Sequence, residues 1–315
     1  MRVICLAYQL IGHMGLRYFL EETEDEVAAV FSHEDAPGEE IWWPSVAELA
    51  KNHGVPVHAP ENINEPQWAD AIRALHADFI FSFWYRHLVK RPILELARSG
   101  ALNLHGSLLP KYRGRVPVNW VLVNGEQKTG ITLHYMIERA DAGDIVGQAV
   151  VPIDTQDTAL SLYSKLADAG LEVLRAAWPL LRAGKAPRIP QDQSEATYFG
   201  RRTPEDGRLD WHWPALAIHN LVRAVTHPYP GAFTRGQGCK LYIWSTLPMP
   251  GLLHPDPPAP GTVTSVSEEG ITVATGEGNL LLRRLQLEGE GELTGRDFAS
   301  RHGLERGSSL CPREA

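Results

Sequence analysis

Short apolar runs alternate with amphipathic segments along the first half of the chain. Val3 to Tyr8, Val27 to Phe31 and Phe79 to Phe83 have the continuous apolar character that is typical of strands buried on both faces. Val46 to Asn52 and Trp68 to Leu75 repeat their apolar positions at helical spacing instead. Strands that alternate with helices predict a doubly wound α/β domain with a parallel sheet, in which ligands bind beyond the carboxyl ends of the strands.

The second half of the chain has a different pattern. An apolar periodicity from Ala159 to Leu181 predicts a long helix that closes the first domain, and the turn-rich residues 184–206 predict a connector. A helix is predicted over Ala217 to Val225, and four short segments rich in leucine or β-branched residues follow it. These segments are Lys240–Ser245, Gly261–Val266, Gly270–Thr275 and Asn279–Leu287. They predict a small β-barrel or antiparallel sheet, so we expect two domains, residues 1–203 and residues 204–315.

Composition limits the class of protein. A chain of 315 residues with 43% apolar content can bury a large core. It has no run of about 18 apolar residues, and its first residues lack the pattern of a signal peptide, so we expect a cytoplasmic protein that does not enter a membrane. Cys5, Cys239 and Cys311 are far apart, which argues against a disulfide framework and against a cysteine zinc site. The net charge of -8 argues against a protein whose main task is to bind nucleic-acid backbone.

The stretch that carries the most chemical information is Leu102 to Arg115. Asn103 and His105 are two residues apart in an extended run, so both side chains project from the same face of a strand. An amide beside an imidazole can donate hydrogen bonds to an oxygen that gains negative charge, and His105 can also carry a proton. This pair is therefore a candidate for acyl-transfer chemistry.

Two acidic residues, Asp141 and Asp144, follow the strand-like segment Thr132 to Met136. Ala142 and Gly143 lie between them, and these small residues indicate a tight turn. A carboxylate at Asp141 close to His105 would favour the protonated form of the imidazole. Together with Asn103, such an acid–base pair suits the transfer of an acyl group to an amine.

Simpler interpretations of the same residues stay open on spacing alone. Asn103 and His105 could be a hydrogen-bonded structural pair, and Asp141 could be a turn or helix-cap residue. Arg113 and Arg115 could be ordinary surface charges.

Several long strings of the sequence resemble the 10-formyltetrahydrofolate-dependent formyltransferases. The strings are Ser82–Leu88, Asn103–Gly114, Pro117–Glu126, Asp141–Ile145, Phe199–Pro204 and Tyr229–Phe233. The resemblance extends over nearly all of the chain, and within the family it is strongest to the members that formylate UDP-4-amino-4-deoxy-L-arabinose in lipid A modification. In a lipopolysaccharide pathway of this kind, the reaction contributes to antibiotic resistance.

This resemblance implies a fold, a cofactor and a set of site residues. The fold would be a Rossmann-like parallel-sheet domain followed by a small OB-like β-barrel. Asn103 would donate to the oxyanion, His105 would handle the proton, and Asp141 would tune His105. The co-substrate would be 10-formyltetrahydrofolate, with no metal. Its contacts would be His87, Leu88, Val89, Arg115, Ile137, Glu138, Arg139, Ala140 and Asp141, and the last five would line the pterin pocket through their backbone.

The acceptor amine is a separate question, because methionyl-tRNA formyltransferases resemble this chain in the same three catalytic residues. The loop from His33 to Trp43 is short and acidic, which disfavours contact with phosphate. Residues 202–315 contain 11 Lys and Arg against 13 Asp and Glu, which provides no surface for tRNA backbone. We therefore expect a nucleotide-linked amino sugar as the acceptor, with Arg201, Arg202 and Arg223 as candidates for its phosphates.

The bifunctional relatives also carry an NAD-dependent decarboxylase, and this sequence has no such half. Ile11 to Gly15 does not form the G-x-G-x-x-G fingerprint, so no NAD site is expected. The oxidative step would then belong to a separate protein or to a part of the enzyme outside this chain. The oligomeric state is left open.

Three rival interpretations come from other classes of protein. A serine hydrolase would rest on Ser107, but the G-x-S-x-G elbow is missing. A zinc enzyme would need close metal-ligand spacing such as H-E-x-x-H, which is also missing. A folate or nucleotide sensor without catalysis is the third, although it would have no use for Asn103, His105 and Asp141 together.

Overall fold

The fold is known from a computed structural model that describes residues 1–35, 40–236, 239–249 and 258–310. Two compact units divide the chain. The first unit comprises Met1–Pro117, Lys128–Ile153 and Tyr163–Gly200, and the second comprises Val118–Gln127, Asp154–Leu162 and the residues from Arg201 onward. The change near residue 200 lies three residues before the boundary expected from the sequence. The two short internal segments of the second unit were not expected.

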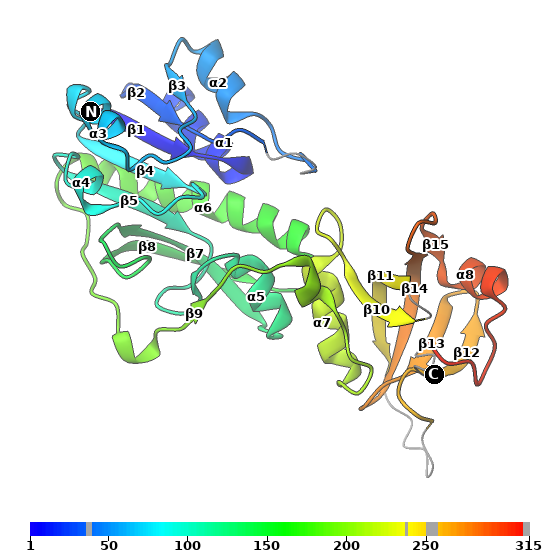
Figure 1. Ribbon diagram of the computed structural model, residues 1–315. Helices are drawn as coiled ribbons and strands as arrows, with labels where there is room; N and C mark the ends of the chain where they lie inside the picture. Colours follow the sequence, from blue (N-terminus) through cyan, green and yellow to red (C-terminus); the bar gives the residue numbers. More distant parts are fainter. Residues whose placement is uncertain (36–39, 237–238, 250–257, 311–315) are drawn as a thin grey trace. The chain divides into compact units, whose positions relative to one another are not determined.

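A seven-stranded sheet forms the centre of the first unit (Figure 1). Its strands lie in the order β3-β2-β1-β4-β5-β7-β8. Their bounds are β1 Arg2–Ala7, β2 Glu26–Phe31, β3 Val57–His58, β4 Phe79–Phe83, β5 Gly100–His105, β7 Lys128–Tyr135 and β8 Ile145–Pro152. The strands from β3 to β5 are parallel, as expected. The chain leaves β1 toward β2 and later returns to β4 on its other side, which makes the β1/β4 boundary the topological switch point.

The parallel sheet predicted from the sequence is confirmed as its larger part, and one edge of it is antiparallel. β5 pairs with β7 in antiparallel direction, and β7 pairs with β8 in the same way. A parallel pair needs a crossover connection of about a dozen residues or more, whereas only residues 136–144 separate β7 from β8. The sheet is therefore mixed and parallel-dominated, and its antiparallel edge begins at the strand that carries Asn103 and His105.

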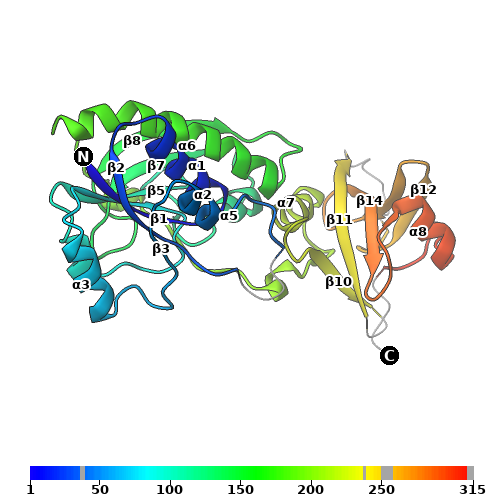
Figure 2. The same ribbon diagram turned by 90° about the horizontal axis from the view of Figure 1, so that it is seen from above.

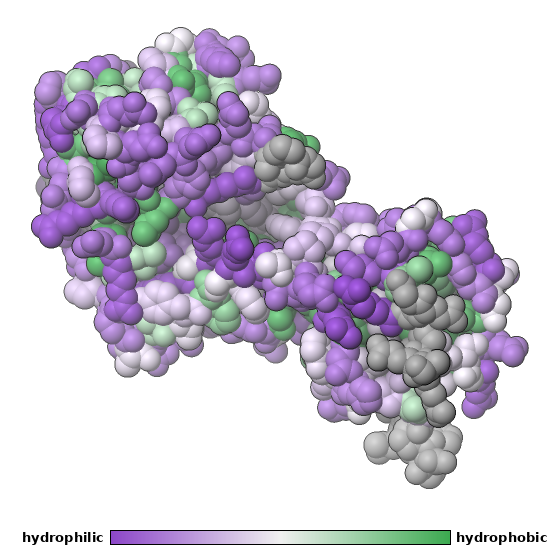
Figure 3. Space-filling model, in the orientation of Figure 1, coloured by the Kyte–Doolittle hydropathy of each residue, from purple (hydrophilic) through white to green (hydrophobic). Residues whose placement is uncertain are grey.

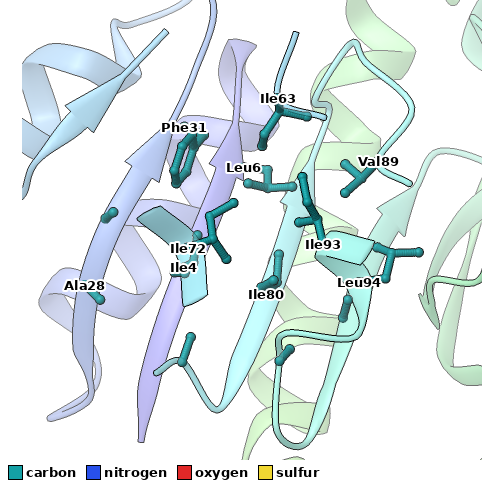
Figure 4. Close-up of a cluster of buried hydrophobic side chains, with 14 residues drawn as sticks. Ile4, Leu6, Ala28, Phe31, Ile63, Ile72, Ile80, Val89, Ile93 and Leu94 are labelled. Carbon is teal, nitrogen blue, oxygen red and sulfur yellow. The ribbon is translucent and has the colours of Figure 1, made fainter. Parts of the chain in front are cut away.

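Helices cover both faces of this sheet (Figures 1 and 2). Their bounds are α1 Gln9–Glu21, α2 Val46–Asn52, α3 Pro66–Ala74, α4 Arg91–Leu94 and α6 Ala159–Arg182, whereas α5 Pro117–Val123 belongs almost entirely to the second unit. Phe81 of β4 packs against Phe19 of α1 and Trp178 of α6, with ring centroids 4.9 and 5.6 Å apart. Ile80, the neighbour of Phe81, points to the opposite face, where it belongs to a buried cluster with Ile72 of α3 (Figure 4). The alternation of side chains along a central strand thus explains why β4 is apolar at every position.

An antiparallel sheet forms the main body of the second unit, as expected. Five strands lie in the order β10-β11-β14-β13-β12, and β15 pairs with β14. The elements from the connector onward are β9 Tyr198–Phe199, α7 Ala215–Val225, β10 Ala232–Gly236, β11 Cys239–Met249, β12 Val263–Ser267, β13 Gly270–Ala274, β14 Asn279–Leu287, β15 Leu293–Thr294 and α8 Gly295–His302. The four strands expected from the sequence correspond to β11–β14, whereas β10 and α8 were not expected. β9 belongs to the first unit, where it pairs with β6 Arg113–Gly114.

No helix among the described residues is both long enough and apolar enough to cross a membrane. On the face shown in Figure 3, the first unit is mainly hydrophilic, with apolar residues scattered singly or in small groups. Ala36 to Glu39 of the acidic loop, and Cys311, lie outside the described residues.

Candidate active site

The last residues of β5 present the amide and the imidazole expected from the sequence. Asn103 pairs with His134 of the antiparallel neighbour β7, and His105 pairs with Thr132. Residues directly opposite each other in an antiparallel pair lie on the same face of the sheet. The register therefore brings a second imidazole, that of His134, next to the amide of Asn103.

Asp141 comes from the loop between β7 and β8 and completes this group. Its Oδ1 lies 3.5 Å from Nδ1 of His105 and accepts a long hydrogen bond of 3.4 Å from Nδ2 of Asn103. Its Oδ2 accepts a hydrogen bond of 2.9 Å from the backbone N–H of Gly114. Asp141 has φ 55°, a left-handed conformation that an L-residue adopts at a cost. The structure thus brings the amide, the imidazole and the carboxylate together, while their catalytic roles stay a prediction.

The carboxyl group of Asp141 is ionised at neutral pH. Burial alone would raise its pKa, but His105, His134 and the backbone N–H of Gly114 act in the opposite direction. Together they hold the pKa of Asp141 well below its usual range. The site therefore contains a fixed negative charge next to His105.

A carbonyl group determines which nitrogen of His105 carries hydrogen. Nε2 of His105 lies 2.8 Å from the carbonyl oxygen of Tyr112, which can only accept. Nε2 must therefore be the donor, so that Nδ1 carries the lone pair in the neutral form. A proton taken up at Nδ1 would face the Asp141 carboxylate, which stabilises the imidazolium.

His134 is a buried residue of the site that the sequence did not single out. Its Nδ1 lies 2.9 Å from the carbonyl oxygen of Tyr135, and its Nε2 lies 3.2 Å from Nδ2 of Asn103. In the tautomer with hydrogen on Nδ1, both contacts are satisfied, and the Asn103 amide points its NH₂ toward His134 and Asp141. The reverse orientation of the amide would place its oxygen against the carboxylate. His134 and Asp141 therefore orient Asn103.

Arg113 is part of the site's interior, so its interpretation as surface charge is wrong. It is fully buried, and its guanidinium donates hydrogen bonds of 3.1 and 2.6 Å to Oε1 of Gln191. The amide of Gln191 in turn donates to the carbonyl oxygens of Asp141 and Gly143, at 2.9 and 2.7 Å. A charged residue loses its hydration when buried unless such partners replace it. Arg113 and Gln191 thereby hold the loop that presents Asp141.

This loop has no room for a side chain at Gly143. A Cβ atom at this position would overlap the carbonyl oxygen of Tyr135. We expect Gly143→Ala to lower the free energy of unfolding by about 1–3 kcal/mol, because the loop must move away from β7. Urea unfolding measures this, with Gly200→Ala as the control, since a Cβ at Gly200 would meet nothing within 4 Å. Equal losses in the two variants would contradict the expectation.

The expected folate contacts lie on two segments that are mostly exposed. Leu88 follows β4 and is 56% exposed, and Ile137 follows β7 and is 48% exposed. Val89 is buried, whereas Arg115, Glu138 and Arg139 are exposed and His87 and Ala140 are half-buried. The hydrogen bond to Glu95 raises the pKa of Arg91, which follows the first segment, and the charge of Glu138 in the second segment adds a smaller effect. Large exposed apolar side chains on neighbouring segments are typical of a surface that binds a flat ring.

The three arginines considered for phosphate binding have different surroundings in the second unit. Arg223 is 8% exposed, and its guanidinium donates to Oδ1 of Asn220 and to the carbonyl oxygen of Asp154. It stabilises the interior, and we do not retain it as a substrate contact. The guanidinium of Arg202 lies 4.6 Å from the ring centre of Trp120 and donates to the carbonyl oxygen of Asp206. Arg201 is exposed.

The rival chemistries have little support at this site. Ser107 is fully buried, and its hydroxyl donates to the carbonyl oxygen of Lys111 at 2.7 Å. It therefore does not act as a nucleophile activated by His105. Among the described residues, no group of three or more His, Cys, Asp or Glu side chains is placed to hold a metal ion.

A neutral histidine lies beyond the carboxyl end of β2. Burial, followed by the nearby charges of His87 and Arg86, lowers the pKa of His33 from the ordinary 6.5 to about 4. Between these two values the unfolded chain takes up a proton that the folded chain does not. Wild type should therefore lose about 1–2 kcal/mol of unfolding free energy between pH 6.5 and pH 4 through this group alone, and nothing through it above that range.

His33→Gln removes this titration and leaves all other groups in place. Urea unfolding of wild type and His33→Gln is measured at a series of pH values. The unfolding free energy of wild type minus that of the variant should fall as the pH falls from 6.5 to 4. Two parallel curves would show that His33 titrates normally in the folded protein.

Comparison with known proteins assigns this site to a family. The formyl transferase family matches residues 15–177, and the C-terminal domain of formyl transferases matches residues 201–303. The chain belongs to the formyl transferase family. The matched regions cover most of both units and include Asn103, His105 and Asp141, the three residues that converge at β5.

Solved structures with the same fold include a sugar formyl transferase, another N-formyltransferase and a protein about twice as long. WlaRD, a sugar 3N-formyl transferase studied with dTDP and 5-N-formyl-THF, is 18% identical, with a TM-score of 0.69 over 92% of this chain and 99% of that chain. An N-formyltransferase from Helicobacter canadensis, in complex with folinic acid and dTDP-3-aminofucose, is 20% identical, with a TM-score of 0.67 over 89% of this chain and 98% of that chain. HypX from Aquifex aeolicus is 18% identical at a TM-score of 0.64, and this formyl transferase spans 50% of its length.

Proposed function

We propose that this formyl transferase moves the formyl group of 10-formyltetrahydrofolate to the amine of a UDP-linked amino sugar, UDP-4-amino-4-deoxy-L-arabinose in particular. The observation that carries the proposal is the convergence of Asn103, His105 and Asp141 at the end of β5. An amide donor, an imidazole and an ionised carboxylate are the groups that acyl transfer to an amine requires.

The geometry supports a sequence of steps. The neutral amine attacks the formyl carbon, and the oxygen that becomes negative accepts a hydrogen bond from Nδ2 of Asn103. The 3.4 Å contact between this Nδ2 and Asp141 is long, so the same N–H can be shared with an oxyanion that lies closer to Nδ2. His105 takes the amine proton at Nδ1, where Asp141 stabilises the cation, and returns it to the leaving N10 of the folate.

The folate is proposed to bind between the two exposed segments described above. Leu88 and Ile137 supply apolar contact for the pterin ring, and His87, Val89 and the backbone from Ile137 to Asp141 surround it. Arg115 supplies positive charge for the glutamate end of the folate. Asp141 belongs to the second segment, so the bound pterin would lie next to the reacting group.

Two observations support a sugar nucleotide as the acceptor instead of charged tRNA. The sequence offers no basic surface from residue 202 onward, since acids outnumber bases there by two. WlaRD and the enzyme from Helicobacter canadensis, which share the fold, are described with dTDP and dTDP-3-aminofucose. A role in lipid A modification would require an NAD-dependent oxidation, carried out outside this chain, among the steps that supply the amino sugar.

A comparison of acceptors tests the proposal. The protein is supplied with 10-formyltetrahydrofolate and, in separate reactions, with UDP-4-amino-4-deoxy-L-arabinose, other UDP- or dTDP-linked amino sugars, and charged initiator tRNA, and release of tetrahydrofolate is followed. Turnover should be fastest with the UDP-linked arabinose derivative. Turnover with charged tRNA alone would reverse the assignment of the acceptor, and folate binding without any turnover would favour a sensor.

A further inference from the structure

A cavity of about 400 Å³ lies beyond the carboxyl ends of β1, β2 and β3, on the side of the switch point away from His105. Its lining includes Tyr8, Gln9, His33, Asp35 and Trp43, all from the first unit. Cavities at this place in open α/β sheets are where ligands bind. None of the residues that the proposed transfer uses belongs to this lining.

The cavity combines aromatic side chains in its wall with an oriented carboxylate. The ring of Trp43 lies edge-on to that of Tyr8, with centroids 5.6 Å apart. The hydroxyl of Tyr8 donates a hydrogen bond of 2.7 Å to Oδ1 of Asp35. Among the described residues, no donor to Oδ2 of Asp35 is found, so this oxygen can accept a hydrogen bond from a ligand. Nε2 of His33 accepts from the backbone N–H of Arg86, so Nδ1 of the neutral ring carries a hydrogen that it can donate.

This chemistry fits a nucleoside better than a phosphate. Glu34 and Asp35 both line the cavity, and Lys51 is the only Lys or Arg in the described lining, so an anion inside it would be repelled. A carboxylate just beyond the second strand of such a sheet is placed to accept hydrogen bonds from ribose hydroxyls. Tyr8 and Trp43 are 3% and 9% exposed, so a base would contact the edges of these rings and not an open ring face.

A chain of contacts connects the cavity with the catalytic strand. Gln9 has the left-handed φ of 60°, and its Oε1 lies 3.4 Å from the hydroxyl of Tyr163. The ring of Tyr163 packs against Trp84, and a Cβ at Gly106, next to His105, would collide with the Trp84 ring. The ends of β1 and β5 are two strand spacings apart, roughly 10 Å. A sugar with its diphosphate spans such a gap, and the guanidinium of Arg86, 4.4 Å from the centre of the Tyr8 ring, supplies positive charge beside it.

We propose that this cavity binds the nucleoside of the acceptor, and that Asp35, held by Tyr8, selects ribose over 2′-deoxyribose. The inference rests on the proposed function, because it identifies which end of the sugar nucleotide occupies the cavity. A hydrogen bond from the ribose 2′-hydroxyl to Asp35 would explain why a UDP-linked acceptor is preferred to a dTDP-linked one. A site built to accept a hydrogen bond from a hydroxyl discriminates against a ligand that lacks it.

Nucleotide binding tests the inference without any formyl transfer. The affinities of UDP and 2′-deoxy-UDP for the whole protein are measured by calorimetry. Wild type should bind UDP about tenfold to a hundredfold more tightly than 2′-deoxy-UDP, as expected for a hydrogen bond to a charged group. In Asp35→Asn this ratio should fall to within about threefold of unity, and the changes in ligand and protein should be non-additive.

Glu34→Gln is the matched control, since it removes one negative charge from the same cavity and leaves the bond between Tyr8 and Asp35 in place. It should keep the wild-type ratio, whereas Tyr8→Phe should give an intermediate one. Equal affinity of wild type for the two nucleotides would overturn the inference, and so would a preference lost in Glu34→Gln and kept in Asp35→Asn. These outcomes are separate from the acceptor comparison, which can still succeed with a nucleoside bound elsewhere.

Discussion

Replacement of His105 by glutamine is expected to lower kcat for formyl transfer roughly a hundredfold to ten-thousandfold. Glutamine can still donate to the carbonyl oxygen of Tyr112, as Nε2 of His105 does at 2.8 Å, but it cannot take up a proton. The amine proton would then have to leave through solvent. Release of tetrahydrofolate under saturating substrates measures the effect.

The control for this variant is His212→Gln, which removes an exposed histidine of the second unit. His212 bonds only locally, through Nδ1 to Oδ1 of Asp210 at 2.8 Å, so its replacement should leave kcat unchanged. A His105→Gln protein that keeps wild-type kcat would show that the proton does not pass through this imidazole.

Asn103→Ala is expected to lower kcat by about a hundredfold to a thousandfold, the usual cost of removing one donor to an oxyanion. The KM for the folate should change little, because the hydrogen bond to the formyl oxygen strengthens only as charge develops. Asn103→Asp should be at least as damaging, since it would place a second carboxylate against Asp141 and the developing oxyanion. Steady-state kinetics with both substrates varied gives the two parameters separately.

Asn64 offers a matched amide elsewhere in the first unit. Its Nδ2 donates to the carbonyl oxygen of Leu88 at 2.8 Å, and its Oδ1 accepts from the N–H of Lys90 at 2.7 Å. Asn64→Ala should therefore loosen the proposed folate segment, which raises the KM for the folate and leaves kcat near wild type. A loss of kcat in Asn64→Ala together with a wild-type kcat in Asn103→Ala would contradict the role of Asn103 as the donor to the oxyanion.

Local patterns were sufficient for most strands of the sheet, because burial on both faces is visible in the residues themselves. Phe79 to Phe83 was predicted as a central strand and forms β4 with those bounds. The direction of pairing is not a local property, however. The short connection after Tyr135 accounts for the antiparallel pairing of β7 with β8, whereas β5 and β7 are joined by residues 106–127, a length that allows either direction.

The same non-local pairing explains which site residues were missed. His134 reaches Asn103 only through the register between β5 and β7, so nothing in its immediate sequence marks it. A surface position stayed open for Arg113 because charged residues are seldom fully buried, and its partner Gln191 lies 78 residues further along the chain. Asp141 was identified because the sequence resembles a family, since the spacing between Asn103 and Asp141 does not by itself predict a contact.

The central claim is that the formyl group reacts where Asn103, His105 and Asp141 meet. A crystal structure with both products bound, tetrahydrofolate and the N-formylated UDP-sugar, measures this most directly. We expect the formyl oxygen within about 3.2 Å of Nδ2 of Asn103, with N10 of the folate on the side of His105. A formyl oxygen out of hydrogen-bond reach of Asn103, or a folate bound away from the Ile137–Asp141 segment, would contradict the account.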